Sequence, residues 1–178
     1  MWKKLASKEL FSHPRLTLIE DLVELPNGME TTYLRYKDTG NAVTILCRNE
    51  EGKFLLQREY SYPPNQILNQ LPGGSIGLDE DPQEGANREL MEEAKLYAHS
   101  LRPLGEYLMD NRRYSARMFL FLATNLETRV LSEDPEEVFE HRWISEFEMD
   151  ELVLKGEVLN VHTLSTWLFY KLKKETLG

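Results

Sequence analysis

Residues 74–96 read GSIGLDEDPQEGANRELMEEAKL, and this stretch decides the fold expected of the chain. Gly73 precedes it, so a glycine-rich turn leads into a segment with the marks of a helix start. Asp81 suits the N-cap, Pro82 the first helical position and Glu84 the third, which is close to a capping box. The pattern predicts a helix over residues 82–94.

Three glutamates of this helix are spaced to share one face. Glu89, Glu92 and Glu93 occupy positions i, i+3 and i+4, which are neighbours on a helix surface. Like charges at this spacing repel, and a divalent cation would reverse the repulsion, because Mg²⁺ binds carboxylate and phosphate oxygens. Arg88 precedes Glu92 by four residues and is expected to pair with it. The alternative interpretation of the pattern is a solvated acidic face without a ligand.

The stretch resembles the Nudix box, G-x5-E-x7-R-E-U-x-E-E-x-G-U, in which U is a bulky aliphatic residue. One specified position departs from this pattern, since Lys95 stands where the family has glycine. Glycine there helps the chain leave the helix, so we interpret Lys95 as a changed exit and not as a lost ligand. The positions that match are Gly74, Glu80, Arg88, Glu89, Leu90, Glu92, Glu93 and Leu96.

The resemblance implies hydrolysis of a nucleoside diphosphate linked to another group, with Mg²⁺ or Mn²⁺ as cofactor. Carried over by position, Glu92 and Glu93 act in catalysis. The box residues expected to be structural are Gly74, Glu80 and Arg88. The metal ligands expected from the box are Gly73, through its backbone carbonyl, Glu89, Glu92 and Glu93.

A further glutamate is expected from the loop before the strand that contains Trp143. The chain resembles the ADP-ribose pyrophosphatase branch of the family, where a glutamate of this loop acts on the attacking water. Its counterpart here, as catalytic base and metal ligand, is Glu137, with Glu136 or Glu133 as alternatives. The loop can also be read as an acidic surface without a catalytic role.

Hydrophobic periodicity and turn residues divide the rest of the chain into strands and helices. Strands are predicted over residues 16–25, 31–36, 41–48, 53–60, 98–109, 116–123 and 138–144, and helices over 145–154 and 160–174. With the resemblance, this mixture predicts an α/β (α+β) fold, a Nudix-type α/β/α sandwich with a mixed sheet and an N-terminal β-hairpin. We expect residues 1–40 to be a β segment that forms a homodimer, as in the resembled branch, and residues 41–178 to be the Nudix hydrolase domain.

Composition argues against several classes of protein. The net charge of −9 over 178 residues does not attract long nucleic acids. Cys47 is the only cysteine and lies in an apolar run, which predicts a buried strand residue and no intrachain disulfide. Neither a signal peptide nor an apolar run long enough for a membrane span is visible, so we expect a cytoplasmic protein without membrane association.

Residues outside the box are candidates for contact with a small-molecule nucleotide. Arg58 ends a strand near the expected site and can grip a phosphate, or form a surface ion pair instead. Several arginines lie close to Tyr114 in the sequence. They can bind a phosphate while the Tyr114 ring stacks on a base, or they can simply keep the loop soluble. This chain has Ser61 and Gln70 where the resembled branch often has arginine and glutamate. These two departures weaken ADP-ribose as the specific substrate. The candidate substrate-binding residues are Arg58, Tyr62, Gln70, Arg112 and Tyr114.

Three functional hypotheses follow. The first is a metal-dependent Nudix pyrophosphohydrolase acting on a nucleoside diphosphate sugar, with ADP-ribose among the candidates. The second is a dinucleoside polyphosphate or RNA 5′-end pyrophosphohydrolase, for which Tyr114 is a weak cue. The third is a non-catalytic nucleotide-binding Nudix domain, which the presence of Glu89, Glu92 and Glu93 disfavours.

Overall fold

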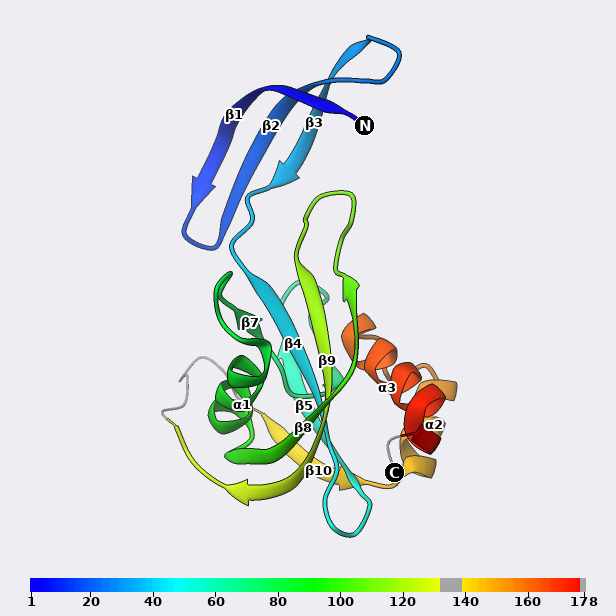
Figure 1. Ribbon diagram of the computed structural model, residues 1–178. Helices are drawn as coiled ribbons and strands as arrows, with labels where there is room; N and C mark the ends of the chain where they lie inside the picture. Colours follow the sequence, from blue (N-terminus) through cyan, green and yellow to red (C-terminus); the bar gives the residue numbers. More distant parts are fainter. Residues whose placement is uncertain (132–138, 177–178) are drawn as a thin grey trace. The chain divides into compact units, whose positions relative to one another are not determined.

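The computed structural model describes residues 1–131 and 139–176, which fall into two compact units (Figure 1). The first unit comprises Met1–Gly40 and Leu108–Arg117, and the second comprises Asn41–Tyr107 and Met118–Gly178. The first unit thus contains a second chain segment in addition to the N-terminal residues. None of the helices in the described part of the chain has the length and apolar character needed to cross a membrane.

The first unit is built on a three-stranded antiparallel sheet in the order β1-β2-β3. The predicted hairpin is formed by β2 (Leu16–Glu24) and β3 (Glu30–Tyr36), and Gly28 in the turn between them has a φ of 82°. The segment Leu108–Arg117 joins this sheet through the amide of Tyr36, which donates to the carbonyl of Arg113 at 2.8 Å.

The first strand, β1 (Lys3–His13), was not predicted from the sequence. Every residue of β1 is exposed, so no alternation of apolar and polar side chains marks it. Its register against β2 also shifts between Lys4 and Ala6 and between Glu9 and Phe11. Such irregularities break the two-residue period from which a strand is recognised.

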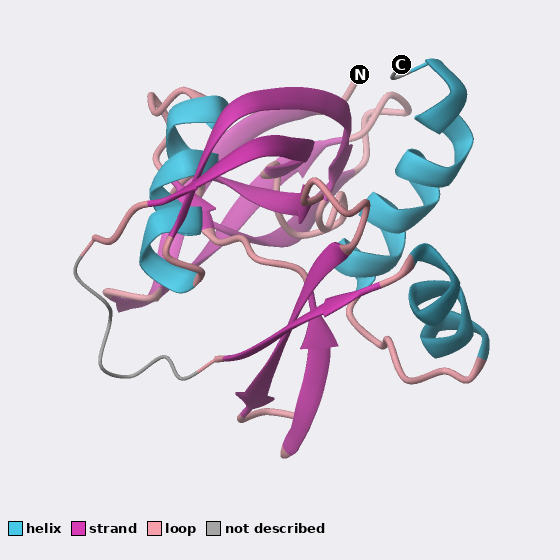
Figure 2. Ribbon diagram, turned by 90° about the horizontal axis from the view of Figure 1, so that it is seen from below, coloured by secondary structure: helices cyan, strands magenta, loops and turns pink. Residues whose placement is uncertain are grey.

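The main sheet of the second unit is mixed, as predicted. Its order is β7-β4-β9-β8, with β4 parallel to β9 and antiparallel to β7. Helix α1 lies on one side of the strands and α2 and α3 lie on the other, which confirms the α/β/α arrangement (Figures 1 and 2). The bounds are β4 Asn41–Cys47, β7 Ser75–Ile76, α1 Pro82–Glu93, β8 Leu96–Leu108, β9 Arg117–Thr128, α2 Glu146–Leu154, α3 Val161–Lys173 and a short 3-10 helix, Lys174–Thr176.

Apolar side chains hold both helical layers against β4. On the α1 side, Ile45 and Cys47 of β4 pack in one buried cluster with Leu90. On the other side α3 also contacts β4, and its Trp167 ring meets the ring of Phe54, the first residue of the strand β5 (Phe54–Ser61), edge to face with centroids 5.2 Å apart. Burial on both faces explains why β4 reads as an unbroken apolar run, and Cys47 is buried in it as predicted.

A second, antiparallel sheet stands beside the first in the order β10-β5-β6. Its strands are β5 (Phe54–Ser61), β6 (Gln66–Gln70) and β10 (Glu140–Ile144). Gln57 of the central strand pairs in register with Gln70 on one side and with His141 on the other. Directly opposed residues share a face, so these three side chains form one row across the sheet.

The box helix ends in a backbone conformation that L residues rarely adopt. Lys95 follows the C-cap Ala94 and has a φ of 58°. Glycine occupies this left-handed region at little cost, whereas lysine adopts it under strain. No carboxylate of the box is lost with Lys95, and its interpretation as a changed exit stays a prediction.

Replacing Lys95 with glycine should stabilise the second unit, because glycine has no Cβ to crowd the backbone in this conformation. We expect K95G to have a free energy of unfolding about 1 kcal/mol higher than K95A, a matched control that removes the same charge but retains the strain. Denaturant unfolding of the two variants measures this difference. Equal stabilities would contradict the assignment of strain to Lys95.

Candidate active site

The start of α1 is fixed by its cap. The Oδ1 atom of Asp81 accepts hydrogen bonds from the amides of Gln83 and Glu84, at 2.9 and 3.1 Å. Pro82 occupies the first turn, where its fixed φ suits the helix and its missing N–H leaves no donor unsatisfied. The helix therefore begins at a defined residue, and this sets the direction in which its glutamates point.

Gly74 allows a carboxylate to approach the loop backbone closely. A Cβ atom at this position would lie 2.3 Å from Oε2 of Glu89, a distance that real Cβ atoms do not reach. The amide of Val43 on β4 donates to the carbonyl of Gly74 at 2.9 Å, which anchors the loop to the main sheet. The carboxylate of Glu89 occupies the space that a side chain at position 74 would take, so a larger residue here would displace that carboxylate.

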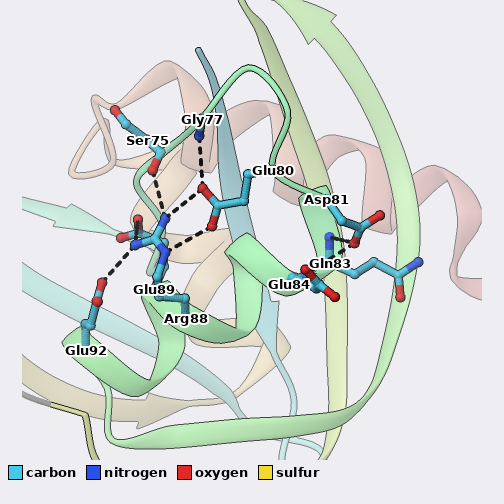
Figure 3. Close-up of polar contacts among 9 residues, drawn as sticks. All are labelled: Ser75, Gly77, Glu80, Asp81, Gln83, Glu84, Arg88, Glu89 and Glu92. Atoms are coloured by element: carbon cyan, nitrogen blue, oxygen red, sulfur yellow. Dashed lines mark hydrogen bonds and ion pairs between the residues drawn. The ribbon is translucent and has the colours of Figure 1, made fainter. Parts of the chain in front are cut away.

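Arg88 lies at the centre of a cluster of carboxylates (Figure 3). Its Nε donates to Oε1 of Glu80 at 3.0 Å, and its Nη1 donates to Oε1 of Glu89 at 2.7 Å. The same Nη1 meets Oε2 of Glu92 at 2.9 Å, the pair expected from the sequence. Nη2 donates to the carbonyl of Ser75 at 3.0 Å, so a single guanidinium joins the helix to the loop.

These contacts favour the charged forms of Glu80 and Arg88. The hydrogen bond from Arg88, followed by that from the amide of Gly77, lowers the pKa of Glu80. Burial by itself would lower the pKa of Arg88, but its hydrogen bonds to Glu80 and Glu89 outweigh burial and raise that pKa. The ion pair of Glu80 and Arg88 consequently persists across the physiological pH range.

Glu93 is held from a different direction. Its side chain is buried, and its Oε2 accepts hydrogen bonds from Nε2 of Gln57 at 3.1 Å and from the amide of Gly73 at 3.0 Å. Burial, and then the negative charge of Glu93, raises the pKa of the Cys47 thiol. Cys47 is therefore a protonated core residue and not a nucleophile.

The chemistry of this donor set fits a hard divalent cation. Glu80, Glu89, Glu92 and Glu93 bring four carboxylates to a region in which Arg88 is the shared cation, so negative charge is in excess. Oxygen ligands of this kind are those that Mg²⁺ and Mn²⁺ take. Within residues 1–131 and 139–176, however, no three acidic, histidine or cysteine side chains converge tightly enough to hold an ion as they stand. The predicted ligand set stays a prediction, with Arg88 now holding two of its members.

The other candidates lie in several places. Glu137 and its alternatives Glu136 and Glu133 lie outside the described residues. Arg58 pairs with Glu140 at 3.0 Å on the surface. The remaining four are Tyr62, which is 82% exposed, Gln70, which donates to Glu59 and accepts from Asn160, and Arg112 and Tyr114, which belong to the first unit.

Gln57 is the site residue for which the sequence analysis predicted no role. It follows three apolar residues in a strand and is completely buried, where a glutamine is uncommon. A polar residue at the end of a buried apolar run is the signal that could have identified it. Its partner, Glu93, is separated from it by 36 positions, and no local pattern connects the two.

Comparison with known families agrees with this geometry. The NUDIX domain model matches residues 38–164. The chain belongs to the Nudix family. The protein "ADP-ribose pyrophosphatase" of Bacillus subtilis (strain 168) is 30% identical over 136 residues, which cover 74% of this chain and 73% of that protein. "ADP compounds hydrolase NudE" of Escherichia coli (strain K12) is 29% identical over 137 residues, which cover 76% and 74%.

The fold is that of a solved Nudix structure. A crystal structure of an ADP compounds hydrolase superposes with a TM-score of 0.90, at 23% identity, over 99% of this chain and 96% of that one. The family assignment and the relatives named above make the chain a Nudix pyrophosphohydrolase. Nudix hydrolases generally use divalent metal ions, which agrees with the donor set of α1.

Replacing Arg88 with methionine should destabilise the Nudix domain by about 2 kcal/mol at neutral pH, because Glu80, Glu89 and Glu92 lose their shared cation. The folded protein holds the pKa of Glu80 below its ordinary value of 4.5. The contribution of Glu80 is therefore present above that value and lost as the pH falls through the lowered pKa. We expect the stability difference between the natural protein and R88M to shrink in acid.

Urea unfolding at neutral pH and at about pH 3.5 measures this difference. The matched control is K155M, which breaks the exposed pair of Lys155 with Glu151 and should change stability by no more than about 0.5 kcal/mol. A loss in R88M that is as small as that in K155M, or that does not depend on pH, would contradict the central place of Arg88.

Proposed function

We propose that the chain hydrolyses the pyrophosphate bond of a nucleoside diphosphate sugar, ADP-ribose or a similar ADP compound. The products would be a nucleoside monophosphate and a sugar phosphate. The observation that carries the proposal is the placement of Glu89, Glu92 and Glu93 on α1, with Glu89 and Glu93 buried beside the glycine loop. The relatives named for ADP-ribose and for ADP compounds support the substrate class.

The residues of the box have distinct tasks in this proposal. Glu89, Glu92, Glu93 and the carbonyl of Gly73 would hold Mg²⁺ or Mn²⁺. The bound ion neutralises phosphate charge and lowers the pKa of a water. Arg88 can release Glu89 and Glu92 from its Nη1 while Nε and Nη2 keep their bonds to the loop. Glu89 and Glu92 would in this way exchange Arg88 for the metal ion, while the Arg88 side chain keeps its position.

We retain Glu137 as the proposed base, with Glu136 and Glu133 as alternatives. A carboxylate with an ordinary pKa can accept a proton once the pKa of the water is lowered. Each of the three glutamates is replaced singly by glutamine in the test. The base is the one whose loss lowers turnover without weakening Mn²⁺ binding, and if none of the three does so, the proposal of a loop base fails.

Substrate contacts are proposed for five residues. In the Nudix domain, Arg58 lines a pocket of about 320 Å³ together with Arg142, and its exposed pair with Glu140 can be given up at little cost. Tyr62 and Gln70 follow on the same hairpin. In the first unit, Arg112 and Tyr114 line a pocket of about 500 Å³ that also contains Arg113 and Tyr33, a combination that suits a phosphate with an aromatic base.

The substrate class is tested with purified protein and a panel of compounds. We expect metal-dependent release of AMP from ADP-ribose or another ADP compound, identified by the masses of both products. Dinucleoside polyphosphates and RNA with a 5′-triphosphate are the competing substrates in the panel. Turnover of those two without turnover of any sugar nucleotide would contradict the proposal.

Replacing Glu93 with glutamine should lower turnover by at least about 100-fold, because the box loses a charged ligand. The matched control is E84Q, which removes an exposed carboxylate from the first turn of the same helix and should leave turnover close to that of the natural protein. Circular dichroism confirms that both variants fold. Activity retained in E93Q would remove the box from the reaction.

We further propose that residues 1–40 join two copies of the chain in a homodimer. Leu10 and Phe11 of β1 are 42% and 54% exposed, in a strand without a buried residue. Exposed apolar groups gathered on one strand mark an interaction surface. We expect F11E to convert a dimer to a monomer in light scattering, whereas L172E, at another exposed leucine, should leave the mass unchanged. A natural protein that is already monomeric would refute the proposal.

The cytoplasmic location stays a prediction.

A further inference from the structure

A glutamine of the second sheet donates a hydrogen bond to the box helix. Gln57 lies on β5, the central strand of the β10-β5-β6 sheet, and is 0% exposed. Its Nε2 atom donates to Oε2 of Glu93 at 3.1 Å. This contact joins a strand of the second sheet to the last turn of α1.

A second donor converges on the same oxygen from the loop. The amide of Gly73 donates to Oε2 of Glu93 at 3.0 Å, so this atom accepts two hydrogen bonds from two different elements. The terminal torsion of a glutamate is broad, and the helix alone does not fix the plane of its carboxylate. Two donors on one oxygen remove that freedom and set the direction of the group.

The Oε1 atom of Gln57 indicates why a glutamine occupies this position. This atom is buried and has no hydrogen-bond partner among the residues that the structure describes. Turning the amide over would place this oxygen against Oε2 of Glu93, so the observed orientation is the one that the carboxylate selects. An apolar residue of the same volume would avoid the unsatisfied oxygen and would fit the buried strand. The donor to Glu93 is the function that explains a glutamine here.

We propose that Gln57 is a positioning residue that fixes the carboxylate of Glu93 for metal binding. This inference rests on the proposed function, in which Glu93 is a metal ligand. Gln57 does not touch the substrate and acts only through Glu93. Partners that orient a metal ligand typically contribute 10- to 100-fold to metal affinity.

The test is Mn²⁺ binding in the absence of substrate, followed by the electron paramagnetic resonance signal of the free ion. Q57L removes the donor and keeps an apolar side chain of similar size. We expect its Mn²⁺ dissociation constant to rise by about tenfold, and the Mg²⁺ concentration for half-maximal turnover to rise by a similar factor. Turnover at saturating Mg²⁺ should recover most of its original value.

The matched control is T166V. Thr166 is likewise 0% exposed, and its hydroxyl donates to the carbonyl of His162 on α3 at 2.7 Å, away from the box. We expect T166V to lower the melting temperature and leave Mn²⁺ affinity unchanged. If Q57L does not fold, Q57M, with an unbranched side chain, replaces it.

The outcomes separate this inference from the function on which it rests. A natural protein that binds no Mn²⁺ would overturn the proposed function together with the inference. A natural protein that binds Mn²⁺ while folded Q57L binds it equally well would overturn the role of Gln57 alone. Loss of affinity in Q57L with affinity retained in T166V supports the role.

Discussion

The candidate active site of the Nudix domain depends on one constraint, which is that buried carboxylates must be compensated. Glu89 and Glu93 are almost completely removed from water, and a charge so placed is costly without a partner. Arg88 compensates Glu89, while Gln57 and the amide of Gly73 compensate Glu93. Contacts of Arg88 and Glu93 join the glycine loop, the helix and the second sheet.

Separate nitrogen atoms of Arg88 bind the helix glutamates and the loop, an arrangement that suits the replacement of Arg88 by a cation at Glu89 and Glu92. Arg88 uses Nη1 for Glu89 and Glu92, and uses its other nitrogens for Glu80 and Ser75. The bonds that a cation would replace are therefore separate from the bonds that hold the guanidinium in place. The groups that donate hydrogen bonds to Glu93, the Gln57 amide and the backbone amide of Gly73, are neutral and carry no positive charge that would compete with a metal ion. The same scaffold can consequently serve the protein with and without an ion.

The sequence predicted the elements whose patterns are local. The Asp81 cap, the helix that follows it and the apolar run of β4 were all predicted within a residue or two. Contacts between distant segments were not predictable in this way, because nothing in the sequence links Gln57 to Glu93. Strand β1 was not predicted, because its residues are all exposed and its register is irregular.

Lys95 shows a second limit of sequence patterns. A lysine stands where the family has glycine, yet Lys95 adopts the left-handed conformation that glycine favours. The amide of Arg129 donates to the carbonyl of Lys95 at 3.0 Å, which ties this residue to the segment after β9. Tertiary contacts can thus override the preference of a single residue, at the expense of local strain.

The central claim is that the glutamates of α1 exchange Arg88 for a divalent cation. Anomalous diffraction from crystals grown with Mn²⁺ tests it most directly, because the ion is located without reference to activity. We predict an anomalous peak within coordination distance of Glu93 and of at least one of Glu89 and Glu92, with Arg88 still bonded to Glu80. A peak elsewhere, or Arg88 still bonded to both Glu89 and Glu92 at saturating Mn²⁺, would contradict the claim.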